Sequence, residues 1–439
     1  MRARLAATAV VSAVVLLVAG CGSGGTAPAL SAPTGVQLFG TDGNMFDALG
    51  AAFKDPDAIS GMVGTTPLTP LTDDFKRRIQ SVDPTVNQFV YGAEAYDAVV
   101  ITALAVTLAR TTDPLTVAKY INGVTTLQPG GVECTTIKDC LDAIAAGKDI
   151  AYRGVAVHGG FTDVGEPSVS SYGTLHFTRG DTIDTGQTEF VTAGSADGAS
   201  KQPPPDPSTG KPVGAPLRLG ILLTYTGDLA KTATPIWAGA HLGIKEFNAA
   251  GGVLGRPIEN EDADDGTDPA KASASFDKLV KDGYGIIIGP NFSGGAKALI
   301  PKAIQTGRIL FSPSATSPSL TTFDDHGQFF RSAASDAFQS EALGDVIMRG
   351  GNRRVFLIAR ADPYGTGLVD GVGQVLVKAG VRKSDIGSRT YQPDQQNFED
   401  LARAAAAFRP DAIMLAGFQE SAKVIAALQA AGIVFSRAP

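Results

Sequence analysis

The second half of the chain alternates between patterns typical of strands and patterns typical of helices. The apolar run LRLGILLT (217–224) precedes a helical pattern from about Ile236 to Phe247. The alternation continues with the strand-like segments YGIIIG, RILFS, RRVFLIA and DAIMLAG, each followed by a helical pattern or a further strand signal. Strands that alternate with helices predict an α/β fold in which parallel sheets carry helices on both faces. Ligand sites in such folds lie at the carboxyl ends of the strands.

The first half is less regular. VQLFG (36–40) is predicted to be a strand, and YGAEAYDAVVITALAVTLAR (91–110) is the strongest helical pattern in the chain. NMFDALGAAF predicts a further helix, while residues 153–190 contain short β-type runs such as SYGTLHF between turn residues. This half is typical of the end of a fold rather than of its beginning.

The N-terminus predicts export and anchoring. In residues 1–20 two arginines precede an uninterrupted apolar or small run, which is the layout of a secretory signal. VAGC, which ends at Cys21, resembles the bacterial lipoprotein box, whose cysteine is acylated; an ordinary cleaved signal is the alternative. Residues 21–33 are predicted to be a flexible tether. The expected location is the extracytoplasmic face of the bacterial membrane, and no later stretch is expected to be long and apolar enough to cross the bilayer.

Two further cysteines agree with an oxidising compartment. Cys134 and Cys140 bracket the segment TTIKD and are predicted to form a local disulfide. A metal site is the alternative, but all four histidines of the chain are isolated in sequence, so no metal is expected.

Composition excludes several classes of protein. The chain has 439 residues, a formal net charge of −7 and 44% hydrophobic residues, which excludes a disordered or collagen-like chain. A mildly acidic chain without a basic stripe argues against nucleic acid as the partner. This length predicts two to three domains.

Six segments of the second half resemble a known family in order and spacing. They are GILLTYTGDLA, IKEFNAAGGVLGRPIE, IIIGPNFSGGAKALIPKA, ILFSPSATSPSL, FFRSAASDAFQ and DPYGTGL. Residues 217–433 therefore resemble the branched-chain amino-acid type of periplasmic substrate-binding protein, the exported receptor of an ABC importer. The resemblance implies a two-lobed type I periplasmic-binding-protein fold with a ligand cleft between the lobes. It implies neither an enzyme nor a cofactor.

The first half resembles later segments of the same fold. VQLFGTDGNMF and GAEAYDAVVITALA would ordinarily follow Gly432-Ile433, so the chain is predicted to be circularly permuted. The last helical pattern ends where a parallel sheet needs another strand, and 36–40 is an unpaired strand at the other end. The proline-rich segment 194–216 would link the original ends. Two incomplete halves that assemble between chains, or a fragmentary gene product, are the alternatives to a permuted monomer.

The permutation divides the chain between two lobes. Lobe one is expected to contain 72–165 and 217–332, and lobe two 34–71, 166–193 and 333–439. Hinge closure between them would bury the ligand.

Donors for a ligand carboxylate are expected in two loops. Ser293 stands where the strand YGIIIG turns into a helix, so its hydroxyl and the free helix amides can meet an anion. In the family a serine at this place binds the carboxylate; a plain N-cap is the alternative. Ser314, Ala315 and Thr316 match the family's carboxylate loop, although an ordinary polar turn has the same composition.

An acid and aromatic residues are expected on the opposite side. Asp42 follows the strand VQLFG, where the family places an acid against the ligand ammonium; a turn aspartate before Gly43 is the alternative. Tyr364 corresponds to a family tyrosine that faces the ligand, or is a half-buried loop aromatic. Thr232 and Phe418 stand where amino-acid receptors of the family can have tyrosines, which predicts a more apolar pocket wall.

Two other functions are weighed against binding and import. Gly365, Gly367 and Gly371 resemble a dinucleotide fingerprint, but the third glycine comes one residue too late. No nucleophile elbow, phosphate loop or metal-ligand spacing is present in the sequence. A sensor or adaptor lipoprotein with the same fold and a ligand other than an amino acid is the alternative. The sequence favours a lipid-anchored receptor that binds an amino acid or related small molecule and delivers it to an ABC permease and ATPase.

Overall fold

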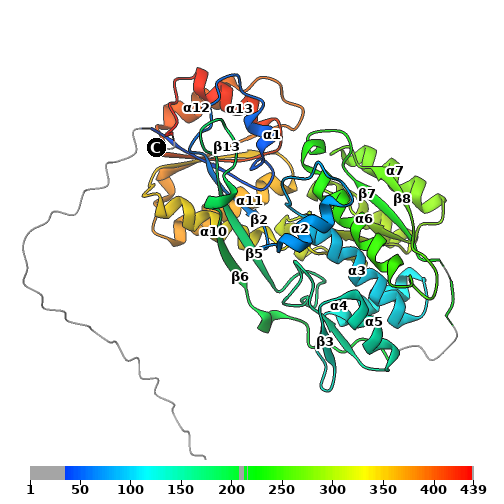
Figure 1. Ribbon diagram of the computed structural model, residues 1–439. Helices are drawn as coiled ribbons and strands as arrows, with labels where there is room; N and C mark the ends of the chain where they lie inside the picture. The colour runs from blue at the N-terminus through cyan, green and yellow to red at the C-terminus, as the bar shows by residue number, and fades with distance from the viewer. Residues whose placement is uncertain (1–34, 207–211, 215, 438–439) are drawn as a thin grey trace, which may run out of the picture. The chain divides into compact units, whose positions relative to one another are not determined.

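Two main β-sheets organise the protein, and helices pack against both of them (Figure 1). The computed structural model describes residues 35–206, 212–214 and 216–437. The predicted signal, the predicted tether with Cys21 and part of the predicted linker 194–216 lie outside the described residues.

The first main sheet has five strands, all parallel, in the order β11-β10-β9-β7-β8. Its strands are β7 (Arg218–Leu223), β8 (Glu259–Asp264), β9 (Ile286–Ile288), β10 (Ile309–Ser312) and β11 (Phe329–Arg331). The central strands are apolar and buried, whereas β8 reads ENEDAD and forms a partly exposed edge. The intervening helices are α6 (Thr234–Ala249), α7 (Pro269–Lys281), α8 (Ser293–Thr306) and α9 (Pro318–Thr321).

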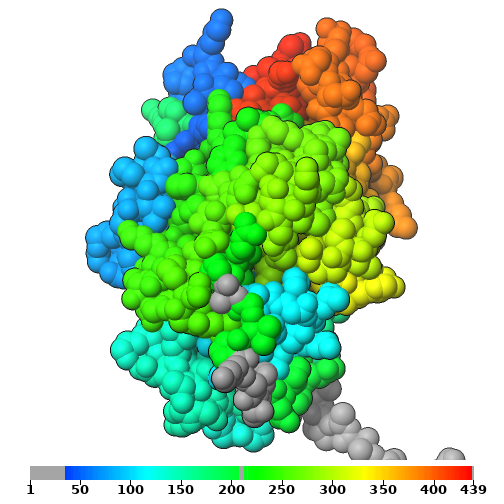
Figure 2. Space-filling model, turned by 90° about the vertical axis from the view of Figure 1, so that its right-hand side faces the viewer, coloured from blue at the N-terminus to red at the C-terminus, as the bar shows by residue number. Residues whose placement is uncertain are grey.

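The second main sheet has seven strands in the order β13-β12-β14-β1-β2-β5-β6. They are β1 (Gln37–Gly40), β2 (Val63–Pro67), β5 (Val169–His176), β6 (Glu189–Gly194), β12 (Val355–Arg360), β13 (Ile386–Tyr391) and β14 (Ala412–Ala416). β1 pairs in parallel with β14, with Leu38 opposite Ile413, and only β5 and β6 are antiparallel. Figure 2 shows the blue N-terminal part of the chain beside its red C-terminal part at one end of the molecule.

The other elements complete the two layers of helices. They are α1 (Asp47–Gly50), α2 (Asp73–Gln80), α3 (Gly92–Ala109), α4 (Pro114–Val124), α5 (Ile137–Ala145), α10 (Asp336–Arg349), α11 (Pro363–Lys378), α12 (Glu399–Phe408), α13 (Ser421–Ala430), the strands β3 (Val132–Cys134) and β4 (Ile150–Tyr152), and the 3-10 turns η1 (Thr185–Gln187), η2 (Ala196–Gly198), η3 (Ala230–Thr232) and η4 (Lys383–Asp385). The helix predicted in NMFDALGAAF is only the single turn α1. It ends at Gly50, where a Cβ atom would lie 1.8 Å from the Asp181 carbonyl oxygen, so glycine lets this turn pack against the Asp181 segment.

α3 is a core helix. By length and composition it is apolar enough to cross a membrane, and it is the one such helix among the described residues. The expectation that no stretch after the N-terminus is long and apolar enough was therefore wrong. In the structure 94% of it is buried, because α6 packs along it. A Cβ atom at Gly239 of α6 would lie 2.0 Å from the Gly92 carbonyl oxygen, so glycine lets the two helices approach closely. Core packing therefore accounts for the apolar sequence of α3.

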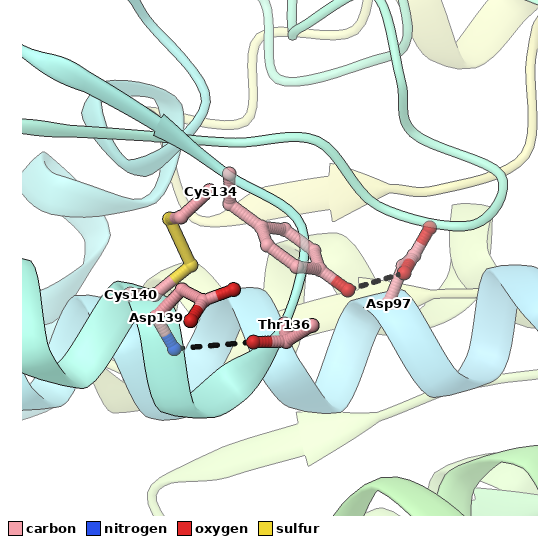
Figure 3. The surroundings of a disulfide bond; sticks show 6 residues. Asp97, Cys134, Thr136, Asp139 and Cys140 are labelled. Atoms are coloured by element: carbon pink, nitrogen blue, oxygen red, sulfur yellow. Dashed lines mark hydrogen bonds between the residues drawn. A yellow bond between two sulfur atoms is a disulfide. The ribbon is translucent and has the colours of Figure 1, made fainter.

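A disulfide joins Cys134 and Cys140 at the start of α5, the pairing that the sequence predicts (Figure 3). It ties β3 to α5. The Thr136 hydroxyl accepts a hydrogen bond of 3.1 Å from the Asp139 amide and caps the helix.

Candidate functional site

A cavity of about 170 Å³ lies at the carboxyl ends of strands from both main sheets. The loops after β1, β7, β9, β10, β12 and β14 all contribute to its lining, as does the segment before α3. A cavity of about 150 Å³ already holds a benzene molecule. The site therefore has room for one small molecule.

Five of the seven predicted ligand-binding residues line this cavity. We call Asp42, Tyr364 and Phe418, which follow strands of the seven-stranded sheet, the acid wall. We call Asn291, Ser293 and Ser314, which follow strands of the five-stranded sheet, the hydroxyl wall. The cavity thus has an acidic side and a hydroxyl-rich side.

Ser293 is the first residue of α8, and Phe292 occupies the N-cap position without a side-chain cap. The structure therefore excludes the plain N-cap role for Ser293. Its hydroxyl oxygen accepts a hydrogen bond from the Ser317 amide at 3.1 Å. No described residue accepts the Ser293 proton, so this proton can be donated into the cavity beside the free amides of α8.

A buried acid holds the hydroxyl wall in place. Asp265 accepts hydrogen bonds from the Thr224 hydroxyl at 2.6 Å and from the Asn291 amide at 2.8 Å. The Ser314 hydroxyl in turn donates to Asn291 Oδ1 at 2.6 Å. Burial raises the pKa of Asp265 to about 6 in spite of these bonds. The carboxylate therefore fixes the loop after β9 through hydrogen bonds.

Ala315 and Thr316 do not line the cavity. They are buried beneath it, 0% and 1% exposed, because the loop after Ser314 turns back into the protein. The Ala315 carbonyl accepts from Arg331 Nη1 at 3.1 Å, and the Thr316 carbonyl accepts from the Asp336 amide at 2.8 Å. The backbone oxygens of Ala315 and Thr316 therefore bind Arg331 and the first residue of α10.

The acid wall is built around the Asp42 carboxylate. Its Oδ2 accepts a hydrogen bond from the Tyr91 hydroxyl at 2.7 Å, and its Oδ1 lies 2.8 Å from the Tyr364 hydroxyl. The Tyr364 oxygen also lies 2.6 Å from the Thr41 hydroxyl. Burial raises the pKa of Asp42, and the hydrogen bonds from Tyr91 and Tyr364 oppose that shift.

Phe418 and Tyr364 form a stacked pair with ring centroids 5.3 Å apart. The Arg360 guanidinium lies 4.7 Å from the centroid of the Phe418 ring. A Cβ atom at Gly43 would lie 2.9 Å from Phe418 and 3.0 Å from the Tyr364 hydroxyl, so only glycine fits there. Thr232 also lines the cavity, as its position in the sequence predicts.

Sequence reasoning missed Tyr91. It has φ +60, an unusual conformation for a residue other than glycine, and is 7% exposed. The pair Tyr91-Gly92 before the strong helical pattern is the only local signal, and it says nothing about the contact with Asp42. This tyrosine comes from the segment before α3, donates to Asp42 and lines the same cavity.

Two further contacts join the two sides of the cavity. Arg360 at the end of β12 pairs with Asp228 in the loop after β7, 2.8 Å apart. The Ser317 hydroxyl donates to the Pro363 carbonyl at 2.7 Å. The loops of the two sheets are therefore in direct contact around the cavity.

The profile of a family described as periplasmic binding protein matches residues 216–438, slightly more than half of the chain. The chain belongs to this family. Its fold is the predicted type I periplasmic-binding-protein fold, with mostly parallel sheets and helices on both faces. The family consists of solute-binding proteins, which are not enzymes.

Curated relatives match over part of their length. A Leu/Ile/Val-binding protein, BraC3, of Rhizobium johnstonii is 25% identical over 213 residues, 48% of this chain and 57% of that protein. A leucine-, isoleucine-, valine-, threonine- and alanine-binding protein of Pseudomonas aeruginosa is 28% identical over 167 residues, 38% of this chain and 44% of that protein. The matches span about half the length of these relatives.

Similar solved structures carry related names. The leucine-binding protein LivK of Thermotoga maritima has a TM-score of 0.45 and 21% identity, covering 50% of this chain and 61% of that one. The branched-chain amino acid transporter substrate-binding protein LivJ of Streptococcus pneumoniae, in complex with isoleucine, has a TM-score of 0.43 and 26% identity, covering 50% and 63%.

Proposed function

We propose that this periplasmic binding protein captures an amino acid in the cavity and delivers it to an ABC importer. The observation that supports this most is the polarity of the cavity, which has an acid on one wall and hydroxyls with a helix N-terminus on the other. A zwitterion presents an ammonium and a carboxylate, so it matches both walls. Curated relatives named for leucine, isoleucine and valine make an apolar side chain the preferred choice.

Different lining residues would contact the carboxylate, the ammonium and the side chain of the ligand. Ser293, Ser314 and the amides of α8 would bind the carboxylate, and Asp42 would bind the ammonium. Tyr364 orients Asp42 through its hydroxyl, while Phe418 would contact the ligand side chain. Ala315 would act only through the backbone contacts of its loop, and Thr316 would act from beneath the cavity.

The lobe boundaries predicted above and the circular permutation are part of the proposal. The pairing of β1 with β14 within one sheet supports a single chain that completes its own fold. A monomer is then sufficient for binding. The segment 194–216 would link the original ends.

Anchoring and delivery follow from the N-terminus and the family. Acylation of Cys21 would hold the receptor at the outer face of the membrane. Closure of the lobes would present the loaded receptor to a permease, and ATP would be hydrolysed by a separate subunit.

A thermal-shift screen of the purified protein against the twenty L-amino acids tests the proposal. A ligand at about one hundred times its Kd adds roughly 2.7 kcal/mol of stability. We expect a leucine-like amino acid to raise the Tm, and both Asp42→Asn and Ser293→Ala to reduce the shift to about half or less. Asp370→Asn, which removes an exposed carboxylate from α11, is the matched control and should keep it.

A cooperative melt without a shift from any amino acid would contradict the proposed ligand class. The sensor with a different ligand would then be the better explanation.

A further inference from the structure

A set of buried polar atoms lies at the first turn of α10. Asp336 and Gln339 are 0% exposed, and Thr316 is 1% exposed. Among the described residues, no hydrogen bond of good geometry reaches either carboxylate oxygen of Asp336, Gln339 Oε1 or Thr316 Oγ1, although the Thr316 hydroxyl lies close enough to lower the pKa of Asp336. Most buried polar atoms in proteins are hydrogen-bonded, and an unpaired buried carboxylate is costly. Acceptors without donors in one place indicate a site for a group that donates several hydrogen bonds.

These acceptors adjoin the acid wall. The Gln339 side chain favours the charged form of Asp42. Burial raises the pKa of Asp336 well above its usual range, and the charge of Asp42 adds to that rise. Both acids also act on Tyr91 and Tyr364, which line the cavity. Asp336 therefore lies close enough to Asp42 for the two charges to act on one another, although Asp336 is buried and does not itself line the cavity.

Two basic side chains lie near the two carboxylates: Arg331, which lowers the pKa of Asp336, and Lys231, which lines the same cavity as Asp42. Arg331 has only a lesser effect on the pKa of Asp336, because its guanidinium is already bonded to Glu166 and to the Ser317 carbonyl. The other charged or titratable groups that act on Asp336 or share its surroundings are Asp42, Asp362, Tyr91, Tyr172 and Tyr364. The site carries an excess of negative charge that a ligand cation would neutralise.

We propose that Asp336 is a second acceptor for the ligand ammonium, which lies between the carboxylates of Asp42 and Asp336. An ammonium replaces the Tyr91 hydroxyl on Asp42 Oδ2 and offers its remaining hydrogens to Asp336 and to the free oxygen of Thr316 or Gln339. Three hydrogens match three acceptors, so the site selects a primary amine. This inference rests on the proposed function and narrows its ligand class.

The arrangement couples binding to a proton. Burial and mutual repulsion raise the pKa of both Asp42 and Asp336, so both cannot be ionised at little cost and one of them holds a proton in the free protein. An ammonium between them takes the place of that proton. Binding therefore releases a proton and weakens as the pH falls.

Calorimetry with three related probes tests the inference. L-leucine should bind, N-methyl-L-leucine should bind about tenfold more weakly, and 4-methylpentanoate, which lacks the amine, at least about a hundredfold more weakly. Asp336→Asn should weaken leucine binding about ten- to a hundredfold. Glu341→Gln, which removes an exposed carboxylate from the same helix, should leave the Kd unchanged. Leucine binding in buffers of different ionisation enthalpy should release a proton, and Asp336→Asn should reduce that release.

Wild-type affinity of Asp336→Asn, or equal affinity for leucine and its N-methyl form, overturns the inference. If leucine does not bind the wild type at all, the proposed ligand is wrong. The Tm values of the wild type and of Asp336→Asn without ligand then test the role of Asp336. An unpaired carboxylate predicts that Asp336→Asn melts higher than the wild type at neutral pH. A lower Tm would show that Asp336 is already satisfied within the fold, and the inference would be wrong.

Discussion

The two main sheets differ in how the chain builds them. All strands of the five-stranded sheet lie between residues 218 and 331, whereas the seven-stranded sheet takes strands from both ends of the chain and places β1 between β14 and β2. Both sheets nevertheless direct the loops at their carboxyl ends to the same cavity. The position of a strand within its sheet therefore matters for the site, and its position along the chain does not.

The sheets also contribute different chemistry. The hydroxyl wall contains donors and no charged side chain, while the acid wall contains Asp42 with Asp336 behind it. A ligand with opposite charges at its two ends satisfies both walls. The predictions below change one part of the molecule at a time.

The largest effect is expected from separating the halves of the chain. Residues 35–206 expressed alone contain β1, β2, β5 and β6 without β14, which flanks β1 on its other side, and residues 212–437 contain β14 without β1. We expect neither piece to melt cooperatively alone, and the two together to form a complex with one transition. Gel filtration and calorimetry measure both outcomes. A cooperative transition in residues 212–437 alone would show that its part of the seven-stranded sheet does not need β1.

The strand and helix pattern was predictable wherever buried runs alternate with amphipathic ones, as from Leu217 onward. Residues that directly follow a strand, such as Asp42 and Ser293, were placed at the cavity because parallel strands end at one edge of a sheet. Ala315 and Thr316 were misplaced at the cavity, because the direction of a loop depends on packing with Arg331 and α10. Tyr91 was missed because its contact with Asp42 joins distant segments, and no local pattern encodes such a contact.

A buried acid on α3 tests whether every buried carboxylate belongs to the site. Burial raises the pKa of Glu94 from 4.5 to about 8, and this residue does not line the cavity. The folded state then holds the proton more tightly than the unfolded chain, so stability falls as the pH rises from about 4.5 to about 8. We expect Glu94→Gln to raise stability at pH 8 by on the order of a few kcal/mol, with little difference at pH 4.

Thermal melts of Glu94→Gln and the wild type across this pH range measure the effect. Ligand binding should be unchanged, in contrast to Asp336→Asn. A loss of ligand binding in Glu94→Gln would show that Glu94, like Asp336, affects the binding site.

Ser293→Ala separates the contribution of the hydroxyl wall from that of the acid wall. It removes a donor to the ligand carboxylate, so we expect leucine to bind about ten- to a hundredfold more weakly. 3-Methylbutylamine, which is leucine without its carboxylate, should bind the variant and the wild type equally. Calorimetry with both probes measures this. Equal losses for both probes would show that the serine acts through folding instead of the carboxylate.

The disulfide joins β3 to α5 and is expected to affect only that part of the molecule. Removal of a clip around so short a loop lowers stability by about 2 kcal/mol in the chain-entropy estimate. We expect the double change Cys134→Ser and Cys140→Ser to lower the Tm by several degrees without changing the Kd. Chemical denaturation with and without ligand separates the two effects, and a weakened Kd would place α5 in the binding mechanism.

The smallest effect concerns the contact that joins the two sides outside the cavity. Arg360 is 5% exposed and is also paired with Asp362 and Glu420, so it does not need Asp228 for its charge to be neutralised. Asp228 is 41% exposed, which limits this pair to about 1 kcal/mol, or about fivefold in affinity. We expect Asp228→Asn to speed ligand release about fivefold while the association rate changes little.

Stopped-flow kinetics resolve the two rates for this variant. Asp394→Asn is the matched control, because Asp394 lines the same groove as Asp228 but makes no side-chain contact with Arg360. A release rate that is equal in both variants would mean that Asp228 does not hold the closed state, and that the contacts of Tyr91 and Ser317 across the cavity are sufficient. Faster release only in Asp228→Asn, together with faster release from the wild type at high salt, would assign the closed state to this ion pair, since screening weakens an exposed pair before it affects buried hydrogen bonds.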